Sequence, residues 1–347
     1  MKNGVKTNYK KTLVLSAVFL LAAALLTVVS LSVGRYSKVG FFQSLGILVD
    51  SVFNSANIDS SSMDFNVVIN LRLPRTIAAI ITGASLACAG TAFQALFANP
   101  IASPDVLGVT HSSSFGAVLA ISLGLGALGV KLISFTAGCL IVICVYFFAS
   151  ILSKGTRLTF YLLLTGMIVS SVFQSLVSIV KFTADPDNQL SQITYWLMGS
   201  FHQITMNDLG SLALFFVIGF VPLFVLKWRL NLLTLSDIEA YSIGVNIKLF
   251  RIITITCATL LTAVTTSLTG GIAWFGLIVP HIARMIVGND FKDILPVSAS
   301  MGAAFLLMMD IIARSVSVQE IPISILTSLF GAPIFIIVLV RSMRYFR

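Results

Sequence analysis

Charged residues are scarce in this chain of 347 residues: Asp, Glu, Lys and Arg together make up 10% of it. A soluble domain carries about 25% charged residues, so a soluble enzyme or a soluble binding module fits poorly. The 22 Lys and Arg residues outnumber the 13 Asp and Glu residues, but the sequence offers no soluble basic face for nucleic acid. The scarcity of charge favours a membrane protein, and we expect no nucleic-acid partner.

Reactive and metal-binding groups are also few. The four cysteines lie inside apolar runs without the paired spacing of a metal site, and the three histidines are scattered. No HEXXH motif, Ser/His/Asp set or carboxylate cluster is present. Gly124 and Gly129 have the glycine spacing of a phosphate-binding loop, but Val130 follows them. We therefore predict a chain that is not an enzyme and holds no metal or cofactor. If the protein were a transporter driven by ATP, another subunit would have to use the ATP.

Acidic residues are nearly absent from the apolar runs, apart from Asp310 at the end of one. Ion-coupled secondary transporters usually carry buried ionisable groups as relays. The sequence therefore disfavours that class of transporter, which stays as an alternative. A membrane-embedded enzyme is a further alternative, and it would need a reactive cluster that the sequence does not show.

Long apolar runs recur along the whole chain, of which 57% is hydrophobic. About 20 apolar residues cross a bilayer, and ten runs approach this length. They lie at about 13–33, 74–97, 108–128, 132–152, 159–180, 209–226, 252–268, 272–287, 295–313 and 323–340. The first run is longer than a signal-peptide core and lacks a convincing cleavage site, so we expect it to be retained. The sequence predicts one all-α polytopic membrane domain over residues 1–347 with about ten transmembrane helices.

Basic residues orient this topology. With the amino terminus inside, the inner segments hold 15 of the 22 Lys and Arg residues. The positive-inside rule therefore places both termini in the cytoplasm. External loops are then expected at about 34–70 and 181–208, and a cytoplasmic loop at about 227–251.

The segment 71–109 holds an uncharged run between two arginines and Asn99-Pro100. Small residues crowd its second half, which favours close helix packing in lipid, and we expect the part from Asn99 to Asp105 to form the inner turn. Arg72, Arg75 and Arg314 fall at outer helix ends. They could dock an acidic partner; the alternatives are anchoring to lipid phosphates or an i,i+4 pair between Asp310 and Arg314.

The cytoplasmic loop contains a short amphipathic segment at about 235–243, followed by Gly244, a residue suited to end a helix. It could lie on the lipid headgroups or be gripped by a cytoplasmic partner.

Five sequence blocks occur together in a fixed order. They are RLPR at 72–75, GASLACAGTAFQALFANPIASPDVLGV at 83–109, ADPDNQL to WLMGSF within 184–201, GGIAWFGLIVPHIARMIVGND at 270–290, and IPISILTSLFGAPIF at 321–335. With these blocks the chain resembles, over nearly its whole length, the FecCD permeases of ABC importers for iron–siderophore, haem and cobalamin. One departure is Ile323-Ser324 after Pro322, where the family commonly has glycine.

The resemblance implies a ten-helix permease fold and a dimer, homomeric or with a paralogous permease, whose pathway runs at the subunit interface. It also implies two ABC ATPase subunits and an extracytoplasmic substrate-binding protein. By the same resemblance, site residues are expected in four groups, while Pro280, His281 and Arg284 have a structural role. The groups are Arg72, Arg75 and Arg314 for binding-protein docking; Asp237, Glu239, Ala240 and Gly244 for ATPase coupling; Gly166, Ser170, Ser171 and Gln174 for the pathway; and Ser153, Lys154, Gly155 and Thr156 for an inner gate.

The resemblance implies a function in import. The expected substrate is an iron(III)–siderophore, carried across the bacterial cytoplasmic membrane by alternating access, with haem or cobalamin as alternatives. No residue in the sequence identifies the ligand.

Overall fold

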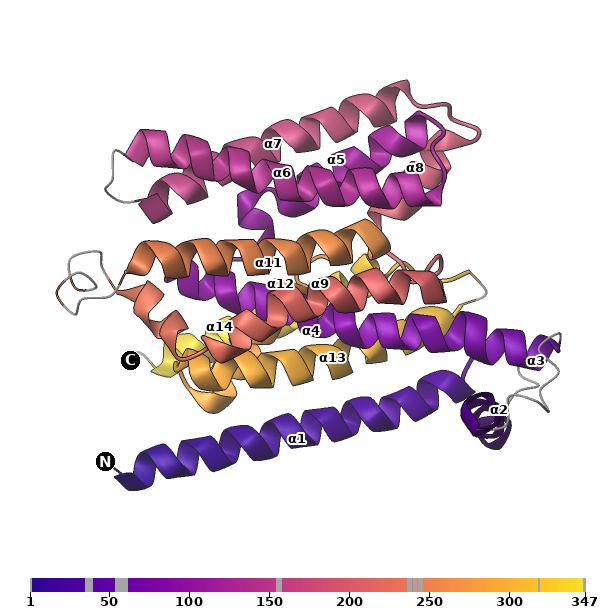
Figure 1. Cartoon of the computed structure of the whole chain (residues 1–347), viewed down its shortest axis with the longest axis horizontal. Helices are drawn as coiled ribbons and strands as arrows, with labels where there is room; N and C mark the ends of the chain where they lie inside the picture. The colour runs from indigo at the N-terminus through magenta and orange to yellow at the C-terminus, as the bar shows by residue number, and fades with distance from the viewer. Residues whose placement is uncertain are drawn as a thin grey trace.

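A computed structural model describes residues 2–34, 40–53, 62–153, 158–235, 239, 242, 246–317 and 319–345. The elements assigned within these residues are all helical (Figure 1). They are α1 Lys2–Ser32, α2 Phe41–Phe53, α3 Met63–Phe65, the π-helical turn η2 Asn66–Arg72, α4 Leu73–Leu96, the 3-10 turn η3 Pro104–Leu107, α5 Val109–Ser122, α6 Ala127–Ser153, α7 Leu158–Thr183, α8 Gln189–Leu197, α9 Met206–Val225, the 3-10 turn η4 Arg229–Thr234, α11 Ile247–Thr269, α12 Phe275–Val287, α13 Phe291–Ser315 and α14 Ile323–Tyr345.

Each of the ten predicted apolar runs coincides with a helix, which confirms the all-α polytopic fold. Seven of the described helical segments are long and apolar enough to cross a membrane. The predicted external loops contain further helices, α2 and α3 in the first and α8 in the second. Helices α5 and α12 are shorter, at 14 and 13 residues.

The helices form a bundle in which both chain ends lie at the same end (Figure 1). We call this the termini end, and we call the opposite end, where α2 and α3 lie, the distal end. Helices α5 to α8 stand together on one side, α1 runs along the other side, and α4 passes between them (Figure 1). Helix α4 contacts α9, α11, α12 and α13, so it is the centre of the packing.

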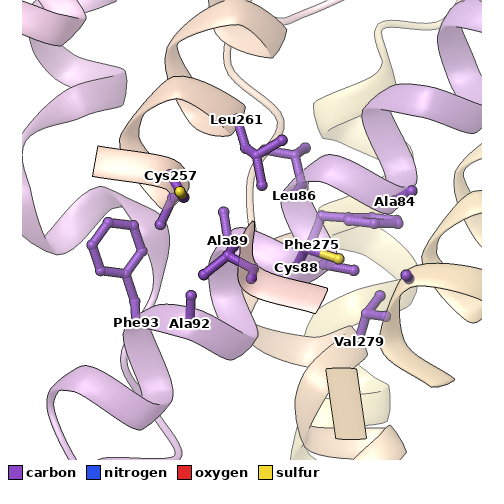
Figure 2. Packing of buried hydrophobic residues seen from close by; sticks show 14 of the residues in the cluster. Ala84, Leu86, Cys88, Ala89, Ala92, Phe93, Cys257, Leu261, Phe275 and Val279 are labelled. Atoms are coloured by element: carbon purple, nitrogen blue, oxygen red, sulfur yellow. The ribbon is translucent and has the colours of Figure 1, made fainter. Parts of the chain in front are cut away.

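Small residues give α4 this central place. Ala84, Cys88, Ala89 and Ala92 lie against side chains of α11 and α12 (Figure 2). Glycines bring the backbones still closer: a Cβ at Gly90 would overlap the carbonyl oxygen of Gly276 in α12. Similarly, a Cβ at Gly83 would overlap the carbonyl oxygen of Gly302 in α13. The small residues of α4 therefore pack helix against helix, as expected for association in lipid.

Helices α5 and α12 are short because each begins inside the bundle. The chain turns at Asn99 and then runs back through η3, so that Pro104 lies against the Cα of Gly276 on one side. On the other side, a Cβ at Gly166 of α7 would overlap the Val106 carbonyl. The predicted inner turn from Asn99 to Asp105 therefore coincides with the connection after α4, but its last two residues, Pro104 and Asp105, already belong to η3 inside the bundle. The sequence between α4 and α5 does not reveal that this connection re-enters the bundle, because it has no local pattern that differs from that of a turn between two helices.

Candidate pathway and docking sites

The three predicted docking arginines come together at the distal end. Arg75 and its neighbours form an ion-pair group, here called the distal arginine cluster: Arg72, Arg75, Arg314, Asp310 and Glu320. Arg75 Nε lies 2.7 Å from Asp310 Oδ1, and Arg75 Nη1 lies 2.9 and 2.8 Å from the two carboxylate oxygens of Glu320. Arg314 Nε lies 3.5 Å from Asp310 Oδ2. Arg72 donates to the Leu31 carbonyl at 2.7 Å.

These arginines are not open surface charges. Arg72, Arg75 and Arg314 are 5%, 8% and 6% exposed. One alternative drawn from the sequence was an i,i+4 pair between Asp310 and Arg314. The distance of 3.5 Å between Arg314 Nε and Asp310 Oδ2 confirms this pair. The docking role of the arginines stays a prediction. All three line a cavity of about 290 Å³, together with Glu320, Phe201 and His202.

Glu320 was missed by sequence reasoning. It lies two residues before Pro322, in the connection between α13 and α14, and 245 positions away from Arg75 in the chain. Its only sequence signal is an acidic residue at an outer helix end, where the three arginines were also placed. The ion pair between Glu320 and Arg75 could not be read from the sequence, because only the fold brings the start of α4 next to the connection between α13 and α14.

Helix α7 divides the four predicted pathway residues into two pairs. Gly166 packs against η3, and the hydroxyl of Ser170 donates to the Gly166 carbonyl at 2.8 Å; the pathway role of both stays a prediction. Ser171 and Gln174 are exposed on the other face. Two further exposed residues, Ser175 and Ser178, continue this face at spacings of three and four residues. The polar stripe of α7 is therefore Ser171, Gln174, Ser175 and Ser178.

A second polar feature lies at mid-depth in the bundle. Leu86, near the middle of α4, lines a cavity of about 20 Å³ together with Ser103, Asp105 and Thr110. Threonines of α11 complete its polar wall: Thr262, Thr265, Thr266 and Thr269. Ser170, near the middle of α7, also lies 3.4 Å from the Asp105 carbonyl. Asp105, which the sequence analysis placed in the inner turn, therefore lies beside a polar cavity. An ionisable residue at this depth is a functional candidate.

The termini end holds the remaining predictions. Ser153 is buried and donates to the Ser150 carbonyl at 3.0 Å, whereas the other gate residues lie outside the described residues: Lys154, Gly155 and Thr156. Of the coupling residues, Glu239 is exposed, and three lie outside the described residues: Asp237, Ala240 and Gly244. The predicted coupling and gate roles stay predictions.

Two polar junctions brace the termini end. Asn231 of η4 donates to Asp290 Oδ1 at 2.9 Å, and Lys292 Nζ lies 2.9 Å from Asp290 Oδ2. Burial opposes ionisation of Asp290, but the hydrogen bonds from Lys292 and Asn231 outweigh burial and lower the pKa of its carboxyl. Arg284 donates to Gln94 at 3.0 Å and joins α12 to α4, a contact that fits the structural role predicted for it. Among the described residues, no group of His, Cys, Asp and Glu has metal-binding geometry.

The sequence and the fold both match known transporters. The pattern of the FecCD transport family covers residues 20–341. The molybdate import system permease protein of Haemophilus influenzae is 38% identical over 314 residues, 89% of this chain and 90% of that protein. A protein of Helicobacter pylori, described as an iron chelatin transport system permease, is 33% identical over 286 residues, 82% of this chain and 86% of that protein.

A solved structure agrees with this assignment. It is described as an inward-facing conformation of a metal-chelate type ABC transporter. The two structures superpose with a TM-score of 0.82 at 35% sequence identity, and the match covers 94% of this chain and 98% of that chain. Together with the helical bundle, these matches establish the family over nearly the whole chain. The chain belongs to the FecCD transport family and is a cell-membrane permease subunit of an ABC importer, a transport component.

Proposed function

We propose that this permease carries an iron(III)–siderophore into the cytoplasm by alternating access. The observation behind this choice is the chemistry of the candidate pathway. The polar stripe of α7 offers hydroxyls and one amide, and the mid-depth cavity adds threonines and the Asp105 carboxylate. None of the described residues in these two sets is Lys, Arg or His. Hydroxyl and amide groups make weak contacts, which suit a large chelate, since conduction requires binding that also permits release.

Molybdate is the second candidate, because a molybdate import permease is 38% identical to this chain. A divalent oxyanion is held most strongly by cationic groups and charge-assisted hydrogen bonds. The described candidate pathway supplies hydroxyls and a carboxylate in their place, and a carboxylate repels an anion. We therefore favour a chelate over a bare oxyanion.

The partners follow from the two ends of the bundle. We propose that the distal end faces outward and that the arginine-lined cavity receives carboxylates of an extracytoplasmic substrate-binding protein. The termini end then faces the cytoplasm, where the segment around Asp237, Glu239, Ala240 and Gly244 couples to two ATPase subunits. These subunits hydrolyse ATP, and the permease itself binds no cofactor. The second permease, identical or paralogous, faces α7 across the pathway.

Transport by the assembled importer tests the substrate. The permease, its ATPase and its binding protein are reconstituted in proteoliposomes, and uptake of radioactive iron bound to a hydroxamate siderophore is compared with uptake of radioactive molybdate. We expect ATP-dependent uptake of the iron chelate and none of molybdate. Uptake of molybdate, haem or cobalamin in its place would overturn the siderophore assignment. Uptake driven by a proton or sodium gradient without ATP would contradict the ABC mechanism.

Docking needs a separate test, and the structure shows where to make it. Charge reversal at Arg75 would place a third carboxylate beside Asp310 and Glu320, so a folding defect would hide any docking defect. Arg72 lines the same cavity, and its Nη1 donates to the Leu31 carbonyl. We expect Arg72→Glu to weaken binding-protein affinity at least tenfold, which is about 1.4 kcal/mol, whereas Lys181→Glu, at the distal end of α7, leaves it unchanged. Equal affinity for both variants would contradict docking at this cavity.

A further inference from the structure

We propose that Glu320 is a resident substitute for the binding protein's carboxylate: docking displaces it from Arg75, and its release is transmitted to α8. This inference rests on the proposed docking function and adds a residue and a route to it. The partner chemistry it requires is a carboxylate side chain on the docking face of the binding protein.

The geometry singles out Glu320 as the displaceable partner of Arg75. Asp310 is fully buried on α13 and does not line the arginine-lined cavity. Glu320 lies in the connection after α13, its side chain is 16% exposed, and it does line the cavity. A carboxylate that enters the cavity therefore reaches Arg75 and Glu320 together, whereas Asp310 stays out of its reach.

Exchange of one carboxylate for another explains why docking at a buried arginine is feasible. Both Glu320 oxygens lie within 2.9 Å of Arg75 Nη1, so an incoming carboxylate has to compete with Glu320 for this donor. Leaving a buried charge without its partner is strongly unfavourable, but an incoming carboxylate restores the pair as Glu320 leaves. A carboxylate added without exchange would instead crowd Asp310 and Glu320, and like charges repel.

Displacement of Glu320 has a direct route to α8. Three residues further along, the Ile323 amide donates to the Gly199 carbonyl at 2.9 Å, and the Ser324 amide donates to the Met198 carbonyl at 3.2 Å. Both acceptors directly follow α8. The Ser324 hydroxyl also donates to the Gly271 carbonyl at 2.6 Å, in the connection between α11 and α12. The segment that carries Glu320 is thus hydrogen-bonded to two connections that border the interior of the bundle.

Helix α8 has room to respond. Its Tyr195 and Trp196 side chains line a cavity of about 390 Å³, whose wall also includes Lys131 and Gln203. Protein interiors are close-packed, and motion of a packed helix requires free volume. A shift of α8 into this cavity would leave the close-packed α4 core in place.

The experiment removes the charge of Glu320 and keeps its shape. Glu320→Gln is prepared in the complete transporter in nanodiscs, and the affinity for the binding protein is measured by titration. Arg75 keeps its bond to Asp310, so we expect a folded protein with about tenfold tighter binding, since a charge-assisted hydrogen bond no longer has to be broken. The control is Asp185→Asn, an exposed carboxylate at the same end outside the cluster, for which we expect unchanged affinity.

A second measurement follows the proposed route. A fluorophore is attached at Ser191→Cys on the exposed side of α8, in a Cys144→Ser background. Docking should change its emission, and Glu320→Gln should produce part of that change without the binding protein.

If Glu320→Gln folds poorly, Glu320→Asp keeps the charge with a shorter reach, and an intermediate gain in affinity is expected. Unchanged affinity and emission in the Glu320 variants, with docking still lost in Arg72→Glu, would overturn this inference alone. Docking unaffected by Arg72→Glu would instead overturn the proposed function.

Discussion

Helices α4 and α7 are similar as sequences and opposite in their surroundings. They contain 24 and 26 residues, and both mix apolar residues with glycine, serine and threonine. In its most apolar window, the candidate span that contains α4 is 83% buried, whereas α7 is 17% buried. Helix α4 lies among four other helices, and α7 lies at one side of the bundle (Figure 1).

The difference lies in what the small and hydroxyl residues contact. In α4, Gly83 and Gly90 bring neighbouring backbones together, and Ser85 and Thr91 are buried. In α7, Gly166 alone makes such a contact, and the polar stripe is exposed. Hydroxyl groups lose little in lipid when they bond the helix backbone, but the Gln174 amide cannot be satisfied in that way. An exposed face with an amide indicates water or another protein chain as its neighbour, in agreement with the proposed pathway between two permeases.

Removing the Asp310 charge should have the largest effect, because it breaks the ion pair that joins α4 to α13. Asp310→Asn leaves Arg75 and Arg314 without their buried carboxylate, and such a loss costs about 3–5 kcal/mol. The comparison variant is Asp185→Asn, in the exposed connection that follows α7, with an expected cost below about 0.5 kcal/mol. Thermal unfolding of the purified permease measures both. Similar unfolding temperatures would show that the ion pair does not stabilise α4.

Filling a glycine contact of α4 should have the next largest effect. Gly90→Ala places a methyl group against the backbone of Gly276, and overpacking typically costs about 1–3 kcal/mol. Gly210→Ala in α9 meets open space and should stabilise the helix slightly, by up to about 1 kcal/mol. Unfolding temperatures and the monodisperse fraction on size-exclusion chromatography distinguish the two variants. A Gly90→Ala protein as stable as Gly210→Ala would refute close packing as the basis of α4's central place.

The contrast between the two helices also marks what the sequence could predict. The positions of the ten apolar helices followed from apolar runs, because the cost of unsatisfied backbone groups in lipid leaves few choices. The crowded small residues of 83–94 correctly indicated a helix that packs inside a bundle. For α7, the resemblance placed Gly166 and Ser170 on the pathway, and that role stays a prediction. The sequence did not reveal that Gly166 contacts η3, a segment about 60 residues earlier in the chain.

The sequence predicted where the residues of the candidate docking site lie, but it predicted few of the contacts that they make. The positions of Arg72, Arg75 and Arg314 at one end of the bundle followed from helix alternation. The burial of Arg75 did not, because its partners Asp310 and Glu320 lie 235 and 245 residues further along the chain. Asp105 was assigned to a turn because no local pattern signals that η3 re-enters the bundle.

The smallest effect on stability, and the sharpest test of what α7 faces, comes from cysteine labelling. Ser175→Cys on the polar stripe should change stability by less than about 0.5 kcal/mol, because the site is exposed. Only thiolates react rapidly with maleimides, and thiolates form in water rather than in lipid. In the assembled transporter, a water-soluble maleimide should therefore label Ser175→Cys.

Two native cysteines are internal controls: Cys88, buried in α4, and Cys144, exposed on α6. If α6 faces lipid and α7 faces water, Cys144 stays unlabelled despite its exposure. Equal labelling at Cys144 and at position 175 would remove the distinction between the two surfaces, and no labelling at 175 would place the stripe against lipid or a dry interface.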